Sequence, residues 1–389
     1  MSGNEDVLLR VENLSMYFGK EPTWQKAVNN VSFDIRKGEV FGLVGESGCG
    51  KTTTGRSIIR LYDATSGSVY FKGQRIVAGT YAQRAEIKSV KKEIRQLEKD
   101  SADASLVQSG KDRIKELRSD IRKAKYDHKH ADKKLVTKIQ MIYQDPVASL
   151  YPRMTVREII SEGLAIQGIR DRKYVDEQVY EMLETVGLVR EHATRYPHEF
   201  SGGQRQRIGI ARSIIMKPEL IIADEPISAL DVSIRAQVIN LLNELRESMG
   251  LTILFIAHDL SVVKYFSDRI GVMYFGNMVE LADSDELFRC PLHPYTKALL
   301  SAIPLPDPDT ERRMYDEAVR RLALNGFVRY EISNFSKIGY ECRHNLGYWT
   351  QIPYIGLGVS SASMIGIHHD DRGFTYTRRT NPETLEEYA

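Results

Sequence analysis

Short apolar runs separated by polar turns dominate the chain from Val7 to Ala78 and return after residue 137. Residues 31–45 read as a strand, a Lys-Gly turn and a second, apolar strand that ends at Gly45. Residues 67–76 form another strand pair around a glycine turn, and the apolar runs within 217–226 and 251–260 are typical of buried strands. Strand and helix patterns alternate over 137–290, which predicts a parallel sheet covered by helices.

The charged segment at residues 80–136 has a different period. Apolar residues recur with spacings of 3, 4 and 3 in two runs: Ile87, Val90, Ile94 and Leu97, then Ile114, Leu117, Ile121 and Ala124. This narrow seam predicts an antiparallel helical hairpin, with its turn in residues 101–110, which include Gly110. Acidic residues are interleaved with the basic ones along the sequence, which argues against RNA or lipid as a partner. The alternative is a solvated charged insertion without a function.

Composition narrows the class of protein. Of 389 residues, 42% are hydrophobic and 27% charged, and the net charge is +2, as in an ordinary soluble globular protein that does not bind nucleic acid. No apolar run is long enough to cross a bilayer, and the N-terminus has no signal-peptide pattern, so we expect a cytosolic chain unless a partner holds it at a membrane. Cys49, Cys290 and Cys342 are too far apart to predict a zinc or iron–sulfur site.

The first motif with chemistry fits the pattern G-x-x-x-x-G-K-[ST], between an apolar strand and a helical run. Backbone N–H groups of such a loop surround phosphate oxygens, and the helix N-terminus adds partial positive charge. Lys51 is expected to contact the β- and γ-phosphates and the Thr52 hydroxyl to bind Mg²⁺. A chance glycine-rich turn is the alternative, and the strand and helix on either side argue against it. The predicted nucleotide-binding residues of this motif are Gly45, Glu46, Ser47, Gly48, Cys49, Gly50, Lys51, Thr52 and Thr53.

Two carboxylates follow the buried strand at 220–223. Asp224 and Glu225 lie where the strand ends, which is the edge at which open α/β sheets bind ligands. Asp224 is expected to hold Mg²⁺, and Glu225 to polarise the water that attacks the γ-phosphate. Two acids after a strand are weak evidence alone, but together with the phosphate-binding loop they predict a nucleotide hydrolase.

The stretch Phe200-Ser201-Gly202-Gly203-Gln204 resembles the LSGGQ signature of ATP-binding cassette proteins, with Phe in place of Leu. The resemblance implies that two cassettes bind ATP between them, and that Ser201, Gly202, Gly203 and Gln204 contact the ATP of a second ATPase subunit. Independently, a glycine pair at a helix N-terminus favours an anion.

Further positions match this family in the same order. The resemblance implies adenine stacking by Tyr17, Mg²⁺ and water contacts by Gln144, a bond from His258 to the γ-phosphate, and Asp231 in the loop that crosses the dimer. With Glu225, the implied catalytic residues are therefore Gln144 and His258. The implied Mg²⁺ ligands are Thr52, Gln144 and Asp224, and the implied cofactors are ATP and Mg²⁺.

The family resemblance implies an α/β fold, the P-loop NTPase cassette, with a mixed or parallel core sheet, an antiparallel β subdomain and a helical subdomain. We assign the ATPase domain to 7–290, the hairpin insertion to 80–136 and the helical subdomain to 145–215. The segment 291–311, with five prolines over 290–311, is interpreted as a linker rather than a core, and 312–389 as a small α+β tail.

The segments at 141–160 and 293–308 are similar to those of oligopeptide and dipeptide importers. This implies an ATPase at the cytoplasmic face of the cell membrane, bound to permease subunits near 145–152 and served indirectly by a solute-binding protein. Importers of nickel or other solutes are an alternative. A cassette acting on DNA or ribosomes is a second alternative, disfavoured by the single cassette and the near-neutral charge.

The tail at 312–389 resembles instead a late part of the oxygen-independent coproporphyrinogen oxidase-like proteins, the HemW haem-chaperone group. The stretches YEISNF, GYECRHNLGYW and YIGLG carry this likeness, but the cysteine triplet for a 4Fe–4S cluster is absent. We expect a fusion near residues 311–314 and a tail that packs loosely, because so small a segment buries little apolar surface. A haem- or SAM-related accessory function is the alternative that the tail suggests.

Overall fold

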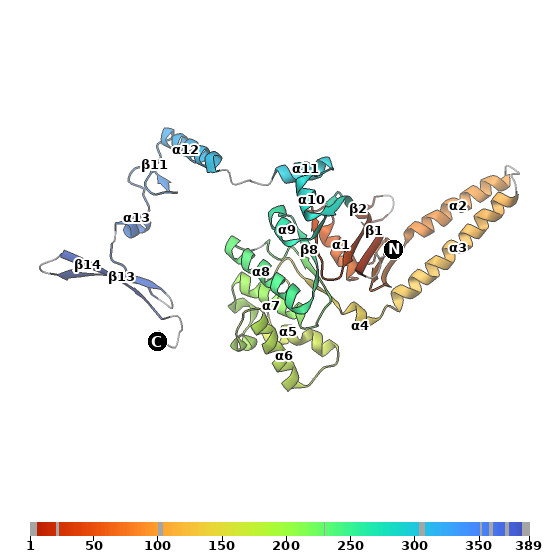
Figure 1. Ribbon diagram of the computed structural model, residues 1–389, viewed down its shortest axis with the longest axis horizontal. Helices are drawn as coiled ribbons and strands as arrows, with labels where there is room; N and C mark the ends of the chain where they lie inside the picture. The colour runs from red at the N-terminus through yellow and green to blue at the C-terminus, as the bar shows by residue number, and fades with distance from the viewer. Residues whose placement is uncertain are drawn as a thin grey trace. The chain divides into compact units, whose positions relative to one another are not determined.

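The computed structural model describes residues 6–20, 23–99, 104–228, 230–302, 308–350, 352–357, 361–369 and 373–382. The chain divides into two compact units, Met1–Ile303 and Pro304–Ala389, each described below by itself (Figure 1).

A six-stranded sheet forms the centre of the first unit, in the order β10-β9-β3-β8-β7-β6. Strands β9, β3, β8, β7 and β6 run parallel, and β10 joins the edge antiparallel to β9. The strands are β3 (Val40–Val44), β6 (Ile139–Ile142), β7 (Leu220–Asp224), β8 (Thr252–Ala257), β9 (Arg269–Tyr274) and β10 (Asn277–Asp283). The strands predicted at 217–226 and 251–260 are β7 and β8.

Both faces of this sheet are buried, and successive residues of β7 alternate between them. Ile221 and Ala223 belong to one hydrophobic cluster, while Leu220 and Ile222 belong to another. The first cluster includes residues of α8 (Val232–Met249) and α9 (Leu260–Phe266); the second includes Ile58 of α1 (Lys51–Ile58) and the inner face of a second sheet. The core sheet therefore lies between helices on one side and α1 with the second sheet on the other.

The second sheet is antiparallel, in the order β2-β1-β4-β5. Its strands are β1 (Val7–Phe18), β2 (Gln25–Arg36), β4 (Ser66–Phe71) and β5 (Gln74–Thr80).

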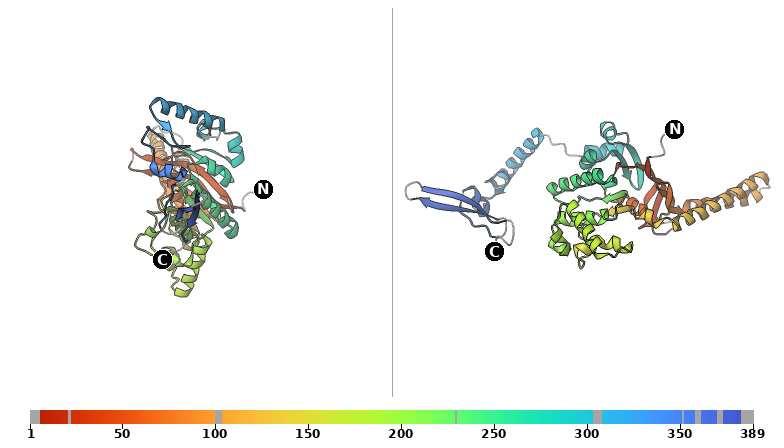
Figure 2. Two further views of the ribbon diagram at one scale, coloured as in Figure 1. Left: turned by 90° about the vertical axis from the view of Figure 1, so that its left-hand side faces the viewer. Right: turned by 60° about the horizontal axis from the view of Figure 1, so that its bottom comes forward.

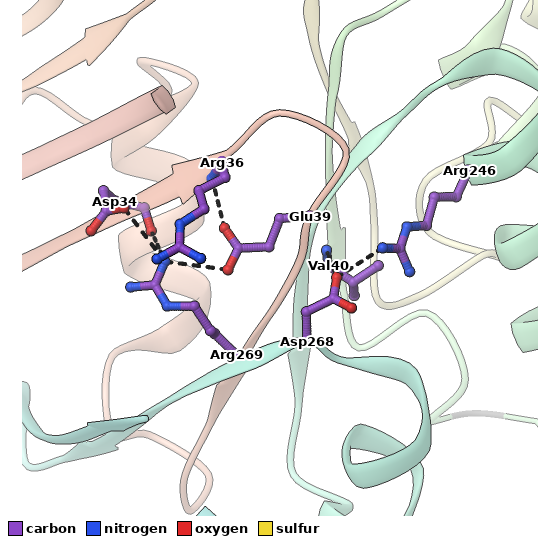
Figure 3. Close-up of polar contacts among 7 residues, drawn as sticks. All are labelled: Asp34, Arg36, Glu39, Val40, Arg246, Asp268 and Arg269. Carbon is purple, nitrogen blue, oxygen red and sulfur yellow. Dashed lines mark hydrogen bonds and ion pairs between the residues drawn. The ribbon is translucent and has the colours of Figure 1, made fainter. Parts of the chain in front are cut away.

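A buried ion pair joins the two sheets where β2 turns into β3 (Figure 3). Glu39 accepts a hydrogen bond from the Arg36 N–H (2.6 Å) and one from the Arg269 guanidinium of β9 (3.2 Å). Arg269 also lies 3.4 Å from an Asp34 carboxylate oxygen. The side chains of Arg269 and Glu39 are only 9% and 5% exposed, so removing either would leave an unpaired buried charge, which costs about 3–5 kcal/mol.

Asp268 makes a similar connection to α8 beside this pair (Figure 3). One carboxylate oxygen accepts from the Val40 N–H (2.8 Å) and from Arg246 (2.9 Å). Arg246 in turn donates to the carbonyl of Gly38 (3.0 Å). These contacts fix the entry of β3, the strand that leads to the phosphate-binding motif at its other end.

A helical subdomain follows β6 (Figures 1 and 2). It contains α5 (Val156–Ile166), α6 (Arg172–Thr185), two 3₁₀ turns and α7 (Gly202–Ile214), all within residues 145–215. Thr155 begins α5 with a capping box: its side chain accepts from the Glu158 N–H, and the Glu158 carboxylate accepts from the Thr155 N–H.

Two long helices, α2 (Tyr81–Lys99) and α3 (Ala104–Lys129), pack as an antiparallel hairpin and are followed by the short α4 (Lys133–Val136) (Figures 1 and 2). Ile94, Ile114, Leu117 and Ala124 of the predicted seam are buried. One expectation was wrong: Gly110 lies inside α3, not in a turn. A Cβ on Gly110 would lie 2.9 Å from a side-chain carbon of Ile94, so glycine allows the two helices to approach closely here.

The proline-containing segment after residue 290 is also more structured than predicted. Residues Ser284–Arg289 form α10 and Pro294–Ser301 form α11. Tyr295, Leu299 and Leu300 pack against the first hydrophobic cluster, and Thr296 is fully buried. Part of the predicted linker is therefore packed on the cassette, because the helix after Pro294 carries apolar residues on one face.

In its described residues, the second unit has no comparable core. Its elements are α12 (Pro308–Leu324), β11 (Val328–Arg329), β12 (Phe335–Ser336), α13 (Arg343–Trp349), and the hairpin of β13 (Ala362–His369) and β14 (Gly373–Thr380). Among its residues with described side chains only Ser363 is buried, while Ile338 and Ile355 are 80% and 77% exposed. The unit begins at Pro304 rather than at the predicted residue 312.

Candidate nucleotide site

The phosphate-binding motif connects the buried strand β3 to α1. Gly45, Gly48 and Gly50 have φ angles of 147°, 82° and 105°, which side chains rarely adopt. A Cβ on Gly45 would lie 2.2 Å from the Met273 carbonyl, and one on Gly50 would lie 2.1 Å from the Ala27 carbonyl. Glycine is therefore required at both positions for the loop to close against β9 and β2.

Lys51 is buried inside this loop. Its ammonium group donates to the carbonyls of Gly45 (2.7 Å) and Glu46 (2.9 Å) and lies 3.7 Å from the Cys49 sulfur. Burial raises the pKa of the Cys49 thiol, and the nearby ammonium group partly opposes this. Cys49 is thus packed in the loop as a neutral thiol.

Thr52 joins the loop to the end of β7. Its hydroxyl donates to one carboxylate oxygen of Asp224 at 2.7 Å. Asp224 is fully buried, and its other oxygen has no hydrogen-bond partner among the described residues. Burial raises the pKa of the Asp224 carboxyl, and the hydrogen bond from Thr52 partly opposes it. A buried carboxylate with an unused oxygen, next to a hydroxyl and a phosphate-binding loop, is a fitting site for a cation.

Glu225 lies at the centre of a second group of contacts. One of its carboxylate oxygens accepts from the Gln144 amide (3.0 Å) and lies 3.1 Å from His258 Nδ1. Glu225 is 9% exposed and has a φ of 46°, and its N–H donates to the carbonyl of Ile256 (2.9 Å). The ends of β6, β7 and β8 therefore bring together three side chains that are far apart in the sequence.

The signature residues lie at the start of α7, and no hydrogen bond in the described part of the chain links them to the loop or to Glu225. Ser201 caps the helix: its N–H donates to Gln204 Oε1 (3.0 Å), and its hydroxyl accepts from the Gln204 N–H (3.3 Å). A Cβ on Gly203 would lie 2.6 Å from a methyl carbon of Ile234 in α8, so the signature packs beside the segment that contains Asp231. Asp231 is exposed at the N-terminus of α8.

Tyr17 lies in an aromatic group that the sequence did not indicate. Its ring is 5.2 Å from that of Trp24, which in turn lies 4.6 Å from Tyr81 at the start of α2. Its hydroxyl donates to Asn29 (2.6 Å), and the Lys26 ammonium lies 5.6 Å from its ring. The hairpin thus begins at an aromatic contact next to the predicted adenine-stacking residue.

Tyr295 is a residue of the site that the sequence analysis did not identify. Its hydroxyl accepts a hydrogen bond from the Glu46 N–H (3.0 Å), and its ring lies 4.2 Å from that of Tyr274. The segment after residue 290 therefore contacts the phosphate-binding loop directly. The sequence marked this segment as typical of a family, but a contact across 249 positions cannot be read from local spacing.

Comparison with known proteins agrees with this geometry. The family described as "ABC transporter" matches residues 28–134 and 104–228, and "Oligopeptide/dipeptide transporter, C-terminal region" matches 279–324. The oligopeptide transport ATP-binding protein OppF of Bacillus subtilis is 54% identical over 320 residues, covering 81% of this chain and 90% of that protein. The chain belongs to the oligopeptide/dipeptide family of ABC transporter ATP-binding proteins.

Two further matches extend this result. OppF of Streptococcus mutans serotype c is 48% identical over 315 residues, covering 80% of this chain and 87% of that protein. The ATP-binding cassette MJ0796, solved as a dimer in a post-hydrolysis state with ADP and Pi, aligns with a TM-score of 0.52 at 23% identity, over 71% of this chain and 99% of the other. At that identity it supports the fold alone, and the predicted α/β cassette fold is confirmed.

The second family match also corrects a boundary. It runs to residue 324, the last residue of α12, so the family's C-terminal region includes the segment 312–324 that we assigned to the tail of other origin. In the described part of the chain, no helix is both long and apolar enough to cross a membrane.

Proposed function

We propose that this chain hydrolyses ATP as the nucleotide-binding subunit of an importer for oligopeptides or dipeptides. The observation that carries the proposal is the convergence of two contacts at one edge of the core sheet. Thr52 bonds to Asp224 at the phosphate-binding loop, and Glu225 bonds to Gln144 and lies within hydrogen-bonding distance of His258 immediately beside it. This arrangement matches what phosphoryl transfer requires of a protein, namely positioning and charge stabilisation.

The residues at the loop would hold both ATP and Mg²⁺. The backbone N–H groups from Gly45 to Thr53 would surround the phosphates, and Lys51 would exchange its bonds to the loop carbonyls for bonds to phosphate oxygens. Thr52 and Asp224 would hold Mg²⁺, with Gln144 close by. When bound, the ion would neutralise charge on the β- and γ-phosphates.

Glu225 is the proposed general base. In the structure, Gln144 and His258 both approach the same Glu225 oxygen, so they orient the carboxylate while its other oxygen is left for water. Upon ATP binding, His258 would turn to the γ-phosphate. These roles require no covalent bond between protein and phosphate.

A second cassette would complete the site. Ser201, Gly202, Gly203 and Gln204 form a helix N-terminus that makes no bond to the nucleotide site in the described part of its own chain, and an anion from another subunit would fit it. Asp231 lies next to it and would meet the same partner. We propose that ATP brings two cassettes together, and that hydrolysis lets them separate.

The permease would bind near residues 145–152, where the described loop follows β6 and precedes α5. Gln144 is at the start of this loop, so movement of the permease would reach the Glu225 carboxylate through one side chain. This would place the chain at the inner face of a cell membrane, held there by its partners. A solute-binding protein would deliver the cargo from the other side.

The alternative function drawn from the tail is not favoured. The match to the C-terminal region of the oligopeptide/dipeptide family extends through α12, the first element of that tail. The comparisons do not support the likeness of 312–389 to the haem-chaperone group, and we propose no activity from it.

Peptide uptake in cells tests the cargo. A strain that lacks this gene should fail to take up a labelled tripeptide, and the wild-type gene should restore uptake. A copy with Glu225→Gln should restore less than about a tenth of it, since the base is lost. Glu286→Gln, an exposed residue of α10, is the matched control and should restore uptake fully.

Uptake of the free amino acid should be unchanged in all four strains. If the deletion left peptide uptake intact and reduced nickel uptake instead, peptide import would be the wrong assignment.

A further inference from the structure

The helical hairpin separates its charges between two sides. On α3, six basic residues follow one another at spacings of 4, 3, 4, 3 and 4, so they form one stripe along the helix. They are Lys111, Lys115, Arg118, Arg122, Lys125 and Lys129. No acidic residue lies in this stripe, and all six side chains are exposed.

A second basic stripe lies on α2. Its four basic residues are exposed and spaced by 4, 3 and 4: Arg84, Lys88, Lys91 and Arg95. Glu98 follows three residues after the last of them. Glu98 pairs with Lys111, the first member of the α3 stripe, at 3.4 Å. Because this pair joins the ends of the two stripes, both stripes lie on the same side of the hairpin. Nine of the ten cations have no ion pair or side-chain hydrogen bond with any described residue.

The opposite side is predominantly acidic. There Arg113 pairs with Glu86 at 2.8 Å and with Glu116 at 2.7 Å. Glu93, Asp120 and Asp127 repeat at seven-residue spacings from Glu86 and Arg113 and share that side. The interleaving of acidic and basic residues that argued against an anionic partner is therefore a property of the sequence and not of the surface.

We infer that the basic side of the hairpin, defined by these ten residues, binds the anionic phospholipid headgroups of the membrane next to which this ATPase works. The α3 stripe alone extends for about 27 Å. The two stripes run along helices that pack side by side, so together they suit a plane of phosphate groups. A cluster of Lys and Arg on a helix is attracted to such a surface by about 1 kcal/mol for each cation.

Nucleic acid fits this surface less well. Neither stripe contains an aromatic side chain on which a base could stack, and base contacts are what nucleic-acid proteins add to phosphate contacts. The two stripes also contain no apolar residue, so the binding would be electrostatic and peripheral, without insertion into the bilayer. The hairpin would thus orient the cassette and add a contact that does not depend on the permease.

The test is co-sedimentation of the full-length protein with vesicles, without permease or nucleotide. Vesicles of phosphatidylcholine mixed with the anionic lipid phosphatidylglycerol should retain the protein, and pure phosphatidylcholine vesicles should not. Changing Lys88, Lys91, Arg118 and Arg122 to Gln removes about 4 kcal/mol of attraction and should weaken binding on the order of 1,000-fold. Raising salt to about 0.5 M should release the wild-type protein.

The matched control removes four cations elsewhere. These four residues are exposed and lie outside the basic side: Lys37, Lys123, Arg289 and Lys297. Changing all four to Gln should weaken vesicle binding less than threefold. Glutamine is a good helix former, and unchanged circular dichroism and ATPase rate would show that both variants fold.

An equal loss of vesicle binding in both four-residue variants would contradict the inference, because net charge alone would then explain binding. It would also be overturned if the basic-side variant bound normally, or if RNA displaced the vesicles at equal phosphate concentration. Since no ATP hydrolysis or transport enters the measurement, its failure is distinct from failure of the proposed function.

Discussion

The cassette and the unit after residue 303 are built from similar proportions of apolar side chains but use them differently. In the cassette, isoleucines such as Ile253 are fully buried between two layers, whereas Ile338 of the second unit is 80% exposed. Buried side chains fix the strand ends that hold Asp224 and Glu225, and nothing comparable orders the second unit in its described residues. Function therefore resides in the region whose packing determines where its polar groups lie.

The largest expected effect is on the stability of the cassette. Ile253→Ala removes a fully buried side chain from the middle of the core sheet, and should lower the free energy of unfolding by about 2–5 kcal/mol. Chemical denaturation of the full-length protein, followed by tryptophan fluorescence and circular dichroism, measures it. A loss as small as that of an ordinary surface substitution would contradict the contrast between the two regions.

A smaller loss of stability is expected near the boundary between the cassette and the second unit. Tyr295→Phe removes the hydroxyl that accepts from the Glu46 N–H but keeps the ring against Tyr274. Loss of one hydrogen bond should cost about 1 kcal/mol, seen as a lower midpoint for the cassette transition. Tyr340→Phe, in the second unit and 81% exposed, is the control and should leave that midpoint unchanged. Equal midpoints for both variants would show that the segment after residue 290 is the linker that its prolines suggested.

The smallest effect belongs to the second unit. Ile338→Ala changes an exposed side chain, and should alter the unfolding free energy of the protein by less than about 0.5 kcal/mol. It is also the matched partner of Ile253→Ala, because the chemical change is the same. A loss at Ile338 as large as the one expected at Ile253 would reveal a packed interface and erase the comparison.

Much of the site could be predicted because its chemistry is local in sequence. The phosphate-binding loop is a short continuous stretch, and its strand and helix are adjacent to it. Asp224 and Glu225 follow four consecutive apolar residues of a buried strand, so their place at the sheet edge was predictable. The seam of the hairpin was predictable for the same reason, since four apolar residues at helical spacing define a face.

The features of the site that the sequence did not predict depend on contacts between segments that are distant in the chain. Tyr295 and Glu46 are 249 positions apart, and Trp24 joins Tyr17 to Tyr81 through side-chain packing that no spacing rule describes. The two charged sides of the hairpin were in principle readable from the seam, by assigning each Lys and Arg to a stripe. The prediction of a turn at Gly110 was wrong because, in a sequence, a glycine at a close helix–helix contact looks the same as a glycine in a turn.

Hydrolysis of ATP by the purified protein tests the central claim most directly. Wild-type protein should release phosphate from ATP only with Mg²⁺, and Glu225→Gln should be slower by about 10²–10⁴-fold while still retaining ATP in a filter-binding assay. That result would place the base at the end of β7, beside the loop that holds the nucleotide. Hydrolysis by Glu225→Gln within twofold of wild type, or no ATP bound by either protein, would contradict the account.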